Sequence, residues 1–261
     1  DGAGTRTRFR KTRGTYDVPV SFRPRFADTL PGGKLSWERD VAPGVLVFAS
    51  VTRGYKAGGV NVDARISPPA DPLTYGTERL WNWEAGVRGH ALERRLTGEM
   101  TAFLLRRDRT QVRDSAGFGG NYRFFTANGR GAQVSGLEGA GAFTVTRGLT
   151  VQAAVAAMDS ELERFTLTNG NPAGGRRLAN TPRYGYTVGV RQECSCGLFA
   201  RLEQVGRAAQ FDSNNHDEQR RAFRVVNAAV GFARGDWTVS LWGRNLLDFR
   251  YEKRVFRSEE H

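Results

Sequence analysis

The sequence predicts an all-β fold, an antiparallel up-and-down transmembrane β-barrel, and three observations carry this prediction. Segments in which apolar and polar residues alternate recur along the whole chain, as expected of strands. Several of them run for about 10–15 residues, longer than the strands of most soluble domains but suited to a tilted membrane strand. They also come in pairs, with a short turn inside each pair and a long polar loop between pairs, which is the pattern of a membrane-spanning barrel.

Composition excludes three other classes of protein. The 261 residues include 39 Lys and Arg against 27 Asp and Glu, 32 Gly and two Cys, with 11% aromatic residues. Two Cys are too few for a disulfide-stapled mini-protein. No run of about 18 apolar residues marks a membrane helix, and the apolar content is too high for a disordered chain.

Five strand pairs are predicted in chain order, each bounded by Gly, Pro, Asn, Asp or charged turn residues. They are residues 33–39 with 45–55, 81–89 with 96–112, 131–145 with 149–158, 184–192 with 198–211, and 225–233 with 237–246. Residues 6–13 and 18–25 form an earlier pair. The connections 56–78, 114–127, 161–182 and 212–224 are long, polar and rich in Gly, Asn, Pro and Arg, and we expect them to be loops at one end of the barrel.

The alternation predicts lipid on one face and water on the other. In residues 81–89 one face carries Trp81, Trp83, Ala85 and Val87, and the other carries Asn82, Glu84, Gly86 and Arg88. Residues 149–157, 184–191 and 237–244 show the same period, whereas 45–52 alternate less cleanly. Aromatic residues at the strand ends suit the interfacial belts of a membrane barrel. A soluble β-sandwich also alternates in this way and remains an alternative at this point.

Five strings resemble segments of TonB-dependent outer-membrane receptors. Residues 50–61 read SVTRGYKAGGVN, 83–89 read WEAGVRG, 128–138 read NGRGAQVSGLE, 180–184 read NTPRY, and 242–248 read WGRNLLD with Tyr251 following. They occur in the order of that family and at the spacing of strand pairs. The resemblance therefore covers most of the chain, roughly residues 30–251.

The resemblance implies that residues 1–261 are a single portion of a barrel of about 22 strands, contributing about ten to twelve of them. The plug domain, the TonB box and the last strand lie outside these residues, so we expect the sequence to be part of a longer chain. Receptors of this family import ferric siderophores, haem, cobalamin or similar chelates across the Gram-negative outer membrane. The implied partners are such a chelate, TonB acting through the plug, and outer-membrane lipid and lipopolysaccharide. A passive porin-like or adhesin barrel is the alternative.

Aromatic and cationic loop residues are the candidates for ligand binding. Cations attract an anionic ferric chelate, and aromatic rings offer it contact area. The predicted binding residues are Tyr55, Lys56, Tyr75, Tyr122, Arg123, Arg176 and Arg177. The same side chains also suit plain loop packing, solvation, or contact with lipopolysaccharide phosphates.

Other chemistry finds little support in the sequence. Basic residues are spread along the strands and loops without a nucleic-acid-binding motif, so the net charge of +12 does not predict nucleic acid as a partner. No catalytic or metal-binding constellation and no cofactor motif is present, although His216 beside Asp212 and Asp217 leaves an outer-membrane enzyme as a rival. Cys194 and Cys196 are consistent with a strained disulfide, a weak metal contact or two incidental turn residues.

Overall fold

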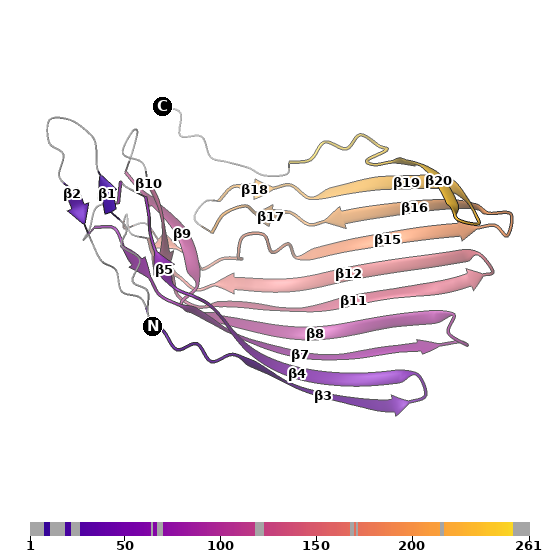
Figure 1. Ribbon diagram of the computed structural model, residues 1–261, viewed down its shortest axis with the longest axis horizontal. Coiled ribbons are helices and arrows are strands. Elements are labelled where there is room, and N and C mark those ends of the chain that lie inside the picture. The colour runs from indigo at the N-terminus through magenta and orange to yellow at the C-terminus, as the bar shows by residue number, and fades with distance from the viewer. Residues whose placement is uncertain are drawn as a thin grey trace.

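The computed structural model describes residues 8–10, 19–21, 27–63, 65–66, 70–117, 123–167, 170, 172–214 and 217–252, and it confirms the all-β prediction. Ten strands form one antiparallel sheet in the order β3-β4-β7-β8-β11-β12-β15-β16-β19-β20, so each strand pairs with the next long strand along the chain (Figure 1). Their bounds are β3 Gly33–Ala42, β4 Val45–Lys56, β7 Glu78–Ala91, β8 Leu96–Asp108, β11 Ala132–Thr146, β12 Leu149–Leu162, β15 Tyr184–Glu193, β16 Leu198–Arg207, β19 Phe223–Arg234 and β20 Trp237–Gly243.

The two ends of this sheet differ, as predicted. Short turns join the strands of each pair at one end, on the right in Figure 1, and long connections gather at the other. The long connections hold two-stranded hairpins: β5 (Gly59–Val60) with β6 (Thr74–Tyr75), β9 (Gln111–Ala116) with β10 (Arg123–Asn128), β13 (Phe165–Thr166) with β14 (Pro172–Ala173), and β17 (Gln210–Phe211) with β18 (Gln219–Arg220). The earlier predicted pair is present as β1 (Arg8–Arg10) and β2 (Pro19–Ser21).

Three predicted strands were too long at the loop end or the chain end. The prediction for 96–112 joined two strands: β8 ends at Asp108, Arg109 takes a left-handed φ of 54°, and β9 begins a separate hairpin. The amide of Thr110 donates to the carbonyl of Arg130, so the chain there pairs with a loop and leaves the main sheet. Likewise β16 ends at Arg207 within the predicted 198–211, and β20 ends at Gly243 within 237–246. After β8 and β16 a loop hairpin begins almost at once, at Gln111 and at Gln210, so the sequence pattern did not mark where these two strands leave the main sheet.

Apolar side chains cover one face of the sheet and remain exposed. The exposed residues on this outer face include Leu35, Trp37, Met100, Leu137, Val155, Leu202, Val239 and Leu241. Soluble chains rarely expose a contiguous apolar area of this extent, whereas a membrane strand presents it to lipid. The ten long strands form one layer and not two packed sheets, which removes the β-sandwich alternative.

Buried apolar packing is concentrated where the strands meet the loops. Ala132, Leu162 and Leu178 form a cluster at this level, with Val134 and Phe165 packed against it. Leu162 ends β12 and is fully buried, so the sheet is anchored to the loop layer at its centre. In the described part of the chain, no helix has the length and apolarity needed to cross a membrane.

Candidate functional site

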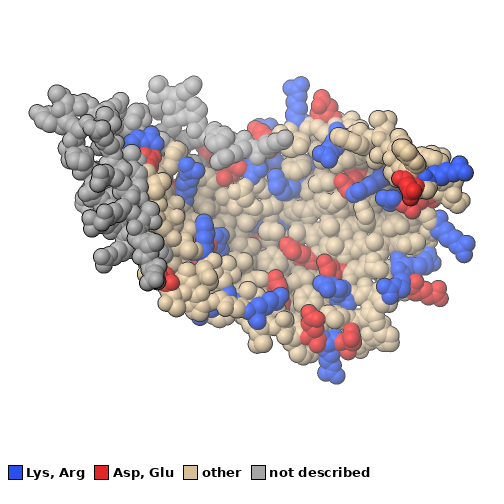
Figure 2. Space-filling model, viewed as in Figure 1, with Lys and Arg blue, Asp and Glu red and all other residues tan. Residues whose placement is uncertain are grey.

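The face of the sheet opposite the apolar outer face is polar and carries both signs of charge. We call it the polar face; its charged residues include Glu84, Arg88, Glu99, Glu138, Arg201 and Glu203, which the cross-strand register places on one side. Figure 2 shows cationic and anionic side chains interspersed over the visible surface, without a field of a single sign. This mixture is what a wet wall requires, because unpaired charges without water are costly.

Several of these charges contact one another. The guanidinium of Arg88 donates from Nε to Glu99 Oε2 at 3.0 Å. Glu84 accepts hydrogen bonds from Ser50 Oγ at 3.2 Å and from Asn82 Nδ2 at 2.8 Å. On β16, Arg201 pairs with Glu203, whose other oxygen accepts from Asn227 at 3.3 Å.

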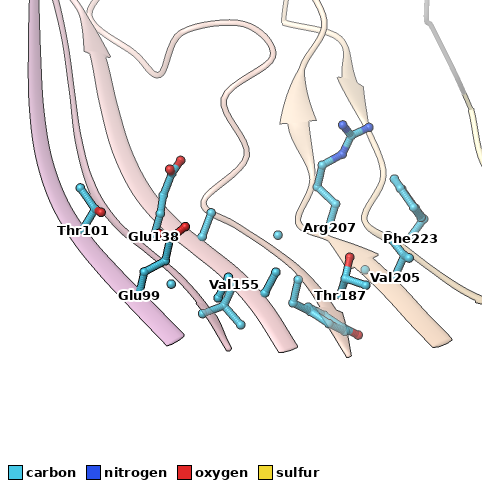
Figure 3. Close-up of a pocket in the computed structure, with 15 residues that line it drawn as sticks. Glu99, Thr101, Glu138, Val155, Thr187, Val205, Arg207 and Phe223 are labelled. Atoms are coloured by element: carbon cyan, nitrogen blue, oxygen red, sulfur yellow. The ribbon is translucent and has the colours of Figure 1, made fainter. Parts of the chain in front are cut away.

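Glu138 differs from its neighbours, because no hydrogen bond or ion pair to its carboxylate occurs among the described residues. It lies on β11 at the rim of a shallow hollow of about 480 Å³ in the polar face. Figure 3 shows Glu99 and Glu138 projecting from adjacent strands, with Arg207 and Phe223 farther across the sheet. The hollow therefore offers two carboxylates, a guanidinium and an aromatic ring to whatever fills the interior.

Above the polar face, the loops are tied to each other by buried polar contacts. Asp71, in the connection before β7, forms an ion pair with Arg123 of β10, in which Arg123 Nη2 donates to Asp71 Oδ1 at 2.7 Å. The Asp71 carboxylate next to it raises the pKa of Arg123. At the tip of the same connection, the hydrogen bond from Arg65 lowers the pKa of Asp63 to about 2.

Two asparagines reinforce the link between the first long connection, between β4 and β7, and the second, between β8 and β11. Asn61 Nδ2 donates to the carbonyls of Pro72 (2.9 Å) and Thr126 (2.8 Å), and its Oδ1 accepts from the Thr126 amide at 2.7 Å. Asn128 makes a similar pair of hydrogen bonds closer to the sheet: its side chain accepts from the Gly76 amide at 2.6 Å and donates to the Gly76 carbonyl at 2.9 Å. Each side chain replaces the ladder bonds that a strand would have made, so the two loops behave as one unit.

Glu78 fixes the base of this unit. It begins β7 and is only 2% exposed, and its Oε1 accepts from Arg107 Nε at 2.7 Å while Oε2 accepts from the Gln111 amide at 2.6 Å. A buried carboxylate is tolerated because every oxygen is bonded and one partner is cationic. The position where β8 gives way to β9 is thereby held by a side chain from the neighbouring strand.

Two predicted binding residues, Arg176 and Arg177, make structural contacts at the loop end of the sheet. Arg176 pairs with Asp217, stacks on the Phe211 ring at 4.6 Å and donates to the Ser213 carbonyl at 3.3 Å. Arg177 pairs with Asp159 and donates to the Met158 carbonyl at 2.8 Å. Arg176 therefore joins the third long connection (residues 163–183) to the fourth (residues 208–222), and Arg177 ties the third connection to the loop end of β12.

The other predicted binding residues are dispersed. Tyr55 alternates with the apolar residues of β4 and is 47% exposed on the outer face, at the loop end. Lys56 is exposed at the end of β4, opposite Glu78. Tyr75 packs over Gly59 in the first loop hairpin, and Arg123 is engaged with Asp71. Tyr122 lies outside the described residues.

A loop hollow that the sequence did not reveal brings Tyr75 together with other side chains. This hollow, of about 580 Å³, is lined by Asn61, Asp63, Arg65, Tyr75, Arg113 and Phe124 among others. Arg113 lies over the Phe124 ring at 4.4 Å. The sequence pattern predicted a strand only to residue 112 and a loop at 114–127, whereas residues 111–116 and 123–128 pair as a hairpin.

Cys194 and Cys196 are joined by a disulfide in the turn between β15 and β16, which decides among the three sequence alternatives. In the described part of the chain, no cluster of three or more His, Cys, Asp or Glu side chains suits a metal ion. His216 lies outside the described residues.

Comparison with known proteins shows which of them share this architecture. The model of a family described as TonB dependent receptor-like, beta-barrel, matches residues 2–246. The structure of the ferric yersiniabactin uptake receptor FyuA from Yersinia pestis aligns with a TM-score of 0.71 at 18% identity, over 93% of this chain and 36% of that one.

Two further structures show the same relation. The copper transporter OprC aligns with a TM-score of 0.69 at 14% identity, over 90% of this chain and 37% of that one. The siderophore receptor PiuA from Acinetobacter baumannii aligns with 0.65 at 16% identity, over 94% and 35%. At these identities the likeness concerns the fold, and this chain spans about a third of each of those proteins.

Proposed function

The chain belongs to the family of TonB-dependent receptor β-barrels, and on that premise we propose that it is part of an outer-membrane receptor that actively imports a chelated metal or cofactor. A ferric siderophore is the leading substrate. The observation that carries the proposal is the combination of a polar, mixed-charge face with a cross-linked loop layer at one end of the sheet. A membrane protein without a transport or binding role would need neither of these two features.

The proposed mechanism assigns binding and containment to these residues and no covalent chemistry. Loops bind the chelate, the polar face forms a wetted wall for its passage, and a plug domain outside this chain moves when TonB delivers energy from the periplasm. The paired charges of the polar face keep the wall hydrated while binding no single ion tightly. Glu99, Glu138 and Arg207 offer hydrogen-bonding groups to the plug or the passing chelate.

We place the first contact with the chelate at the loop hollow lined by Tyr75, Arg113 and Phe124. An anionic, aromatic-bearing chelate is favoured there, because guanidinium groups attract the charge and the rings stack on flat ligand groups. The loops around this hollow are already held together by hydrogen bonds and an ion pair, so ligand binding orders little additional chain. Lys56, Tyr122, Arg176 and Arg177 remain proposed contacts of the chelate.

Outer-membrane lipid and lipopolysaccharide are proposed partners of the outer face. The register aligns Arg53, Trp81 and Arg106 in one cross-strand row near the loop end, with Tyr55 and Arg79 in the next. Arg53 lies over the Trp81 ring at 5.4 Å. Arginine beside interfacial aromatics at headgroup level suits the phosphates of lipopolysaccharide.

The experiment that tests active import is uptake by the full receptor in a Gram-negative strain lacking its own copy. Labelled ferric siderophores are supplied to cells with and without TonB, beside a copper chelate and cobalamin. We expect accumulation of a ferric siderophore that depends on TonB. Accumulation independent of TonB would replace the proposal with the passive pore, and surface attachment without uptake would replace it with the adhesin.

The loop hollow has its own test in Arg113→Gln. Losing one charged hydrogen-bond donor is expected to weaken siderophore binding roughly tenfold. Arg94→Gln, in a short turn at the opposite end of the sheet, is the matched control and should bind normally. Equal affinity of both variants would remove Arg113 from the binding site.

A further inference from the structure

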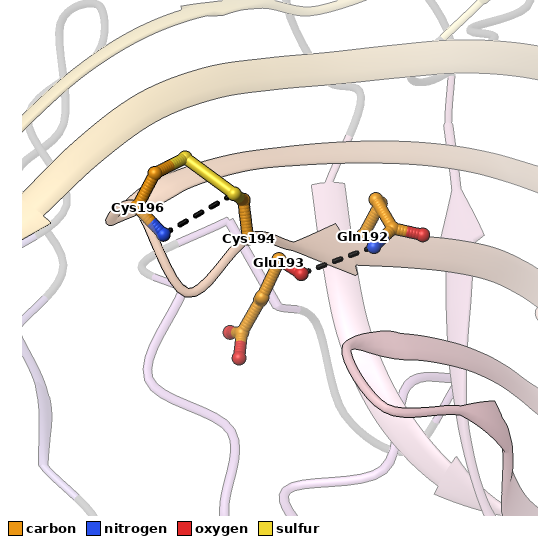
Figure 4. The surroundings of a disulfide bond; sticks show 4 residues. All are labelled: Gln192, Glu193, Cys194 and Cys196. Atoms are coloured by element: carbon orange, nitrogen blue, oxygen red, sulfur yellow. Dashed lines mark hydrogen bonds between the residues drawn. A yellow bond between two sulfur atoms is a disulfide. The ribbon is translucent and has the colours of Figure 1, made fainter.

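The disulfide between Cys194 and Cys196 joins two exposed residues separated by one position, at the short-turn end of the sheet. These are the two cysteines of the whole sequence. Figure 4 shows both side chains at the tip of the turn, where the Cys196 amide donates to Cys194 Sγ at 3.2 Å. Nothing covers the bridge among the described residues.

The turn does not need this bond to close. The Cys194 amide donates to the Leu198 carbonyl at 2.8 Å, and the Gly197 amide donates to the Cys194 carbonyl at 2.9 Å. The Gly197 carbonyl in turn accepts from Ala233 at 2.9 Å, and β15 and β16 continue as an unbroken antiparallel ladder. Backbone hydrogen bonds therefore already fix what the disulfide would otherwise fix.

A bridge between residues i and i+2 also constrains the unfolded chain very little. The stabilisation that a disulfide gives through loop closure grows with the length of the closed loop, and this loop is among the shortest possible. An exposed bridge with little structural role is of the kind that exchanges with other thiols.

Short turns of outer-membrane barrels face the periplasm, so the side on which this bridge lies rests on the proposed function. The periplasm is oxidising and maintains disulfides by thiol exchange. We propose that Cys194 and Cys196 form a reversible dithiol–disulfide site on the periplasmic rim of the barrel, exchanging with a dithiol protein of that compartment.

The exchange balances without any further reagent. A thiolate of the partner attacks one sulfur of the Cys194–Cys196 bond, forming a mixed disulfide and releasing the other cysteine as a thiolate. The second thiolate of the partner then attacks the partner's own sulfur in the mixed disulfide, which forms the partner's internal disulfide and expels the remaining receptor cysteine as a thiolate. The two receptor thiolates take up the two protons that the partner's thiols have lost. The partner leaves oxidised by two electrons, and Cys194 and Cys196 remain as two thiols.

The first test is labelling of the folded receptor, purified in detergent without reductant, with a maleimide that adds visible mass. We expect no label at these positions until dithiothreitol is added, and then two labels per chain while the barrel stays folded. The C194S/C196S variant reports the background from the rest of the receptor. Labelling before reduction, or only after the barrel is unfolded by heat, would overturn the proposal.

The second test separates an exchange site from a structural bond. Cys196→Ser leaves Cys194 without a neighbour to expel an attached thiol, so oxidised glutathione should give a lasting adduct on this variant. On the reduced wild-type receptor the same reagent should instead restore the internal bridge. A lasting adduct on both proteins, or on neither, contradicts the proposal.

Stability gives a third readout that is independent of transport. The melting temperature of C194S/C196S should lie within about 2 °C of the wild type, because the closed loop is so short. A larger drop would make the bridge structural. Siderophore uptake can fail for the whole receptor without altering any of these three results, so failure of the proposed function and failure of this proposal are distinguishable.

Discussion

Arg123 and Asp71 form an ion pair across 52 positions of sequence, and the Asp71 side chain is 1% exposed. The pair joins the connection before β7 to the hairpin of β9 and β10. Because the Asp71 carboxylate is buried away from water, the loops lose stability if Arg123 is removed.

Removing Arg123 should therefore loosen the loop unit. Arg123→Gln removes the cation that is paired with the buried Asp71 carboxylate, at an expected cost of about 3 kcal/mol. The double variant R123Q/D71N should recover part of this loss. Hydrogen exchange of the β9 and β10 amides measures the effect.

The control for that prediction is Arg65→Gln, since the Arg65 side chain is half exposed in its pair with Asp63. Exchange in β9 and β10 should stay close to wild type in this variant. If Arg65→Gln and Arg123→Gln accelerate exchange equally, burial is not what makes the Asp71 pair important.

The Asp63–Arg65 contact predicts a defined acid response of the first loop. The pKa of Asp63 falls from 3.8 to about 2, mainly through the Arg65 hydrogen bond. A lowered carboxyl pKa means that its contribution to stability is complete above pH 4 and is lost as the pH falls toward 2. Carboxyl NMR of Asp63 in the detergent-solubilised receptor should follow this window, and in Arg65→Gln the midpoint should return toward 3.8.

Replacing Glu78 and Glu99 by Gln should destabilise the barrel to different extents. Glu78→Gln weakens the charged hydrogen bonds to Arg107 and the Gln111 amide, at an expected cost of about 2 kcal/mol. Glu99→Gln breaks only the exposed pair with Arg88 and should cost less than about 1 kcal/mol. Urea unfolding of the barrel in lipid vesicles compares them, and similar midpoints would contradict the assigned roles.

Two glycines at positive φ form a further matched pair. Gly148 has a φ of 90° and a Cβ there would press against the Glu193 carbonyl, while Gly235 has a φ of 55° and open space around it. We expect Gly235→Ala to cost about 1 kcal/mol from the left-handed backbone alone. Gly148→Ala should cost about 2–3 kcal/mol. The same unfolding assay tests the order, and a reversed order would show that the turn relaxes around Gly148.

The meander and its facing were determined by the sequence by itself. Trp81, Trp83 and Val87 alternate with Asn82 and Glu84, and this period is local, so it specifies strands and faces without knowledge of partners. Gly, Pro and charged turn residues then mark the reversals, and sequential antiparallel pairing follows from the short turns. The same alternation places Tyr55 on the outer face. Its position in the strand pattern already indicated this, although its aromatic side chain led to its prediction as a binding residue.

Only the tertiary structure decided how the loops are built. Asp71 with Arg123 and Arg176 with Asp217 pair across dozens of residues, and a sequence rich in both signs offers many such partners without ranking them. Which charge is buried depends on where the hairpins fold back over the sheet. In the Asp71–Arg123 pair the carboxylate is buried, so breaking the pair is costly and Arg123 holds the loops together instead of being available to a ligand.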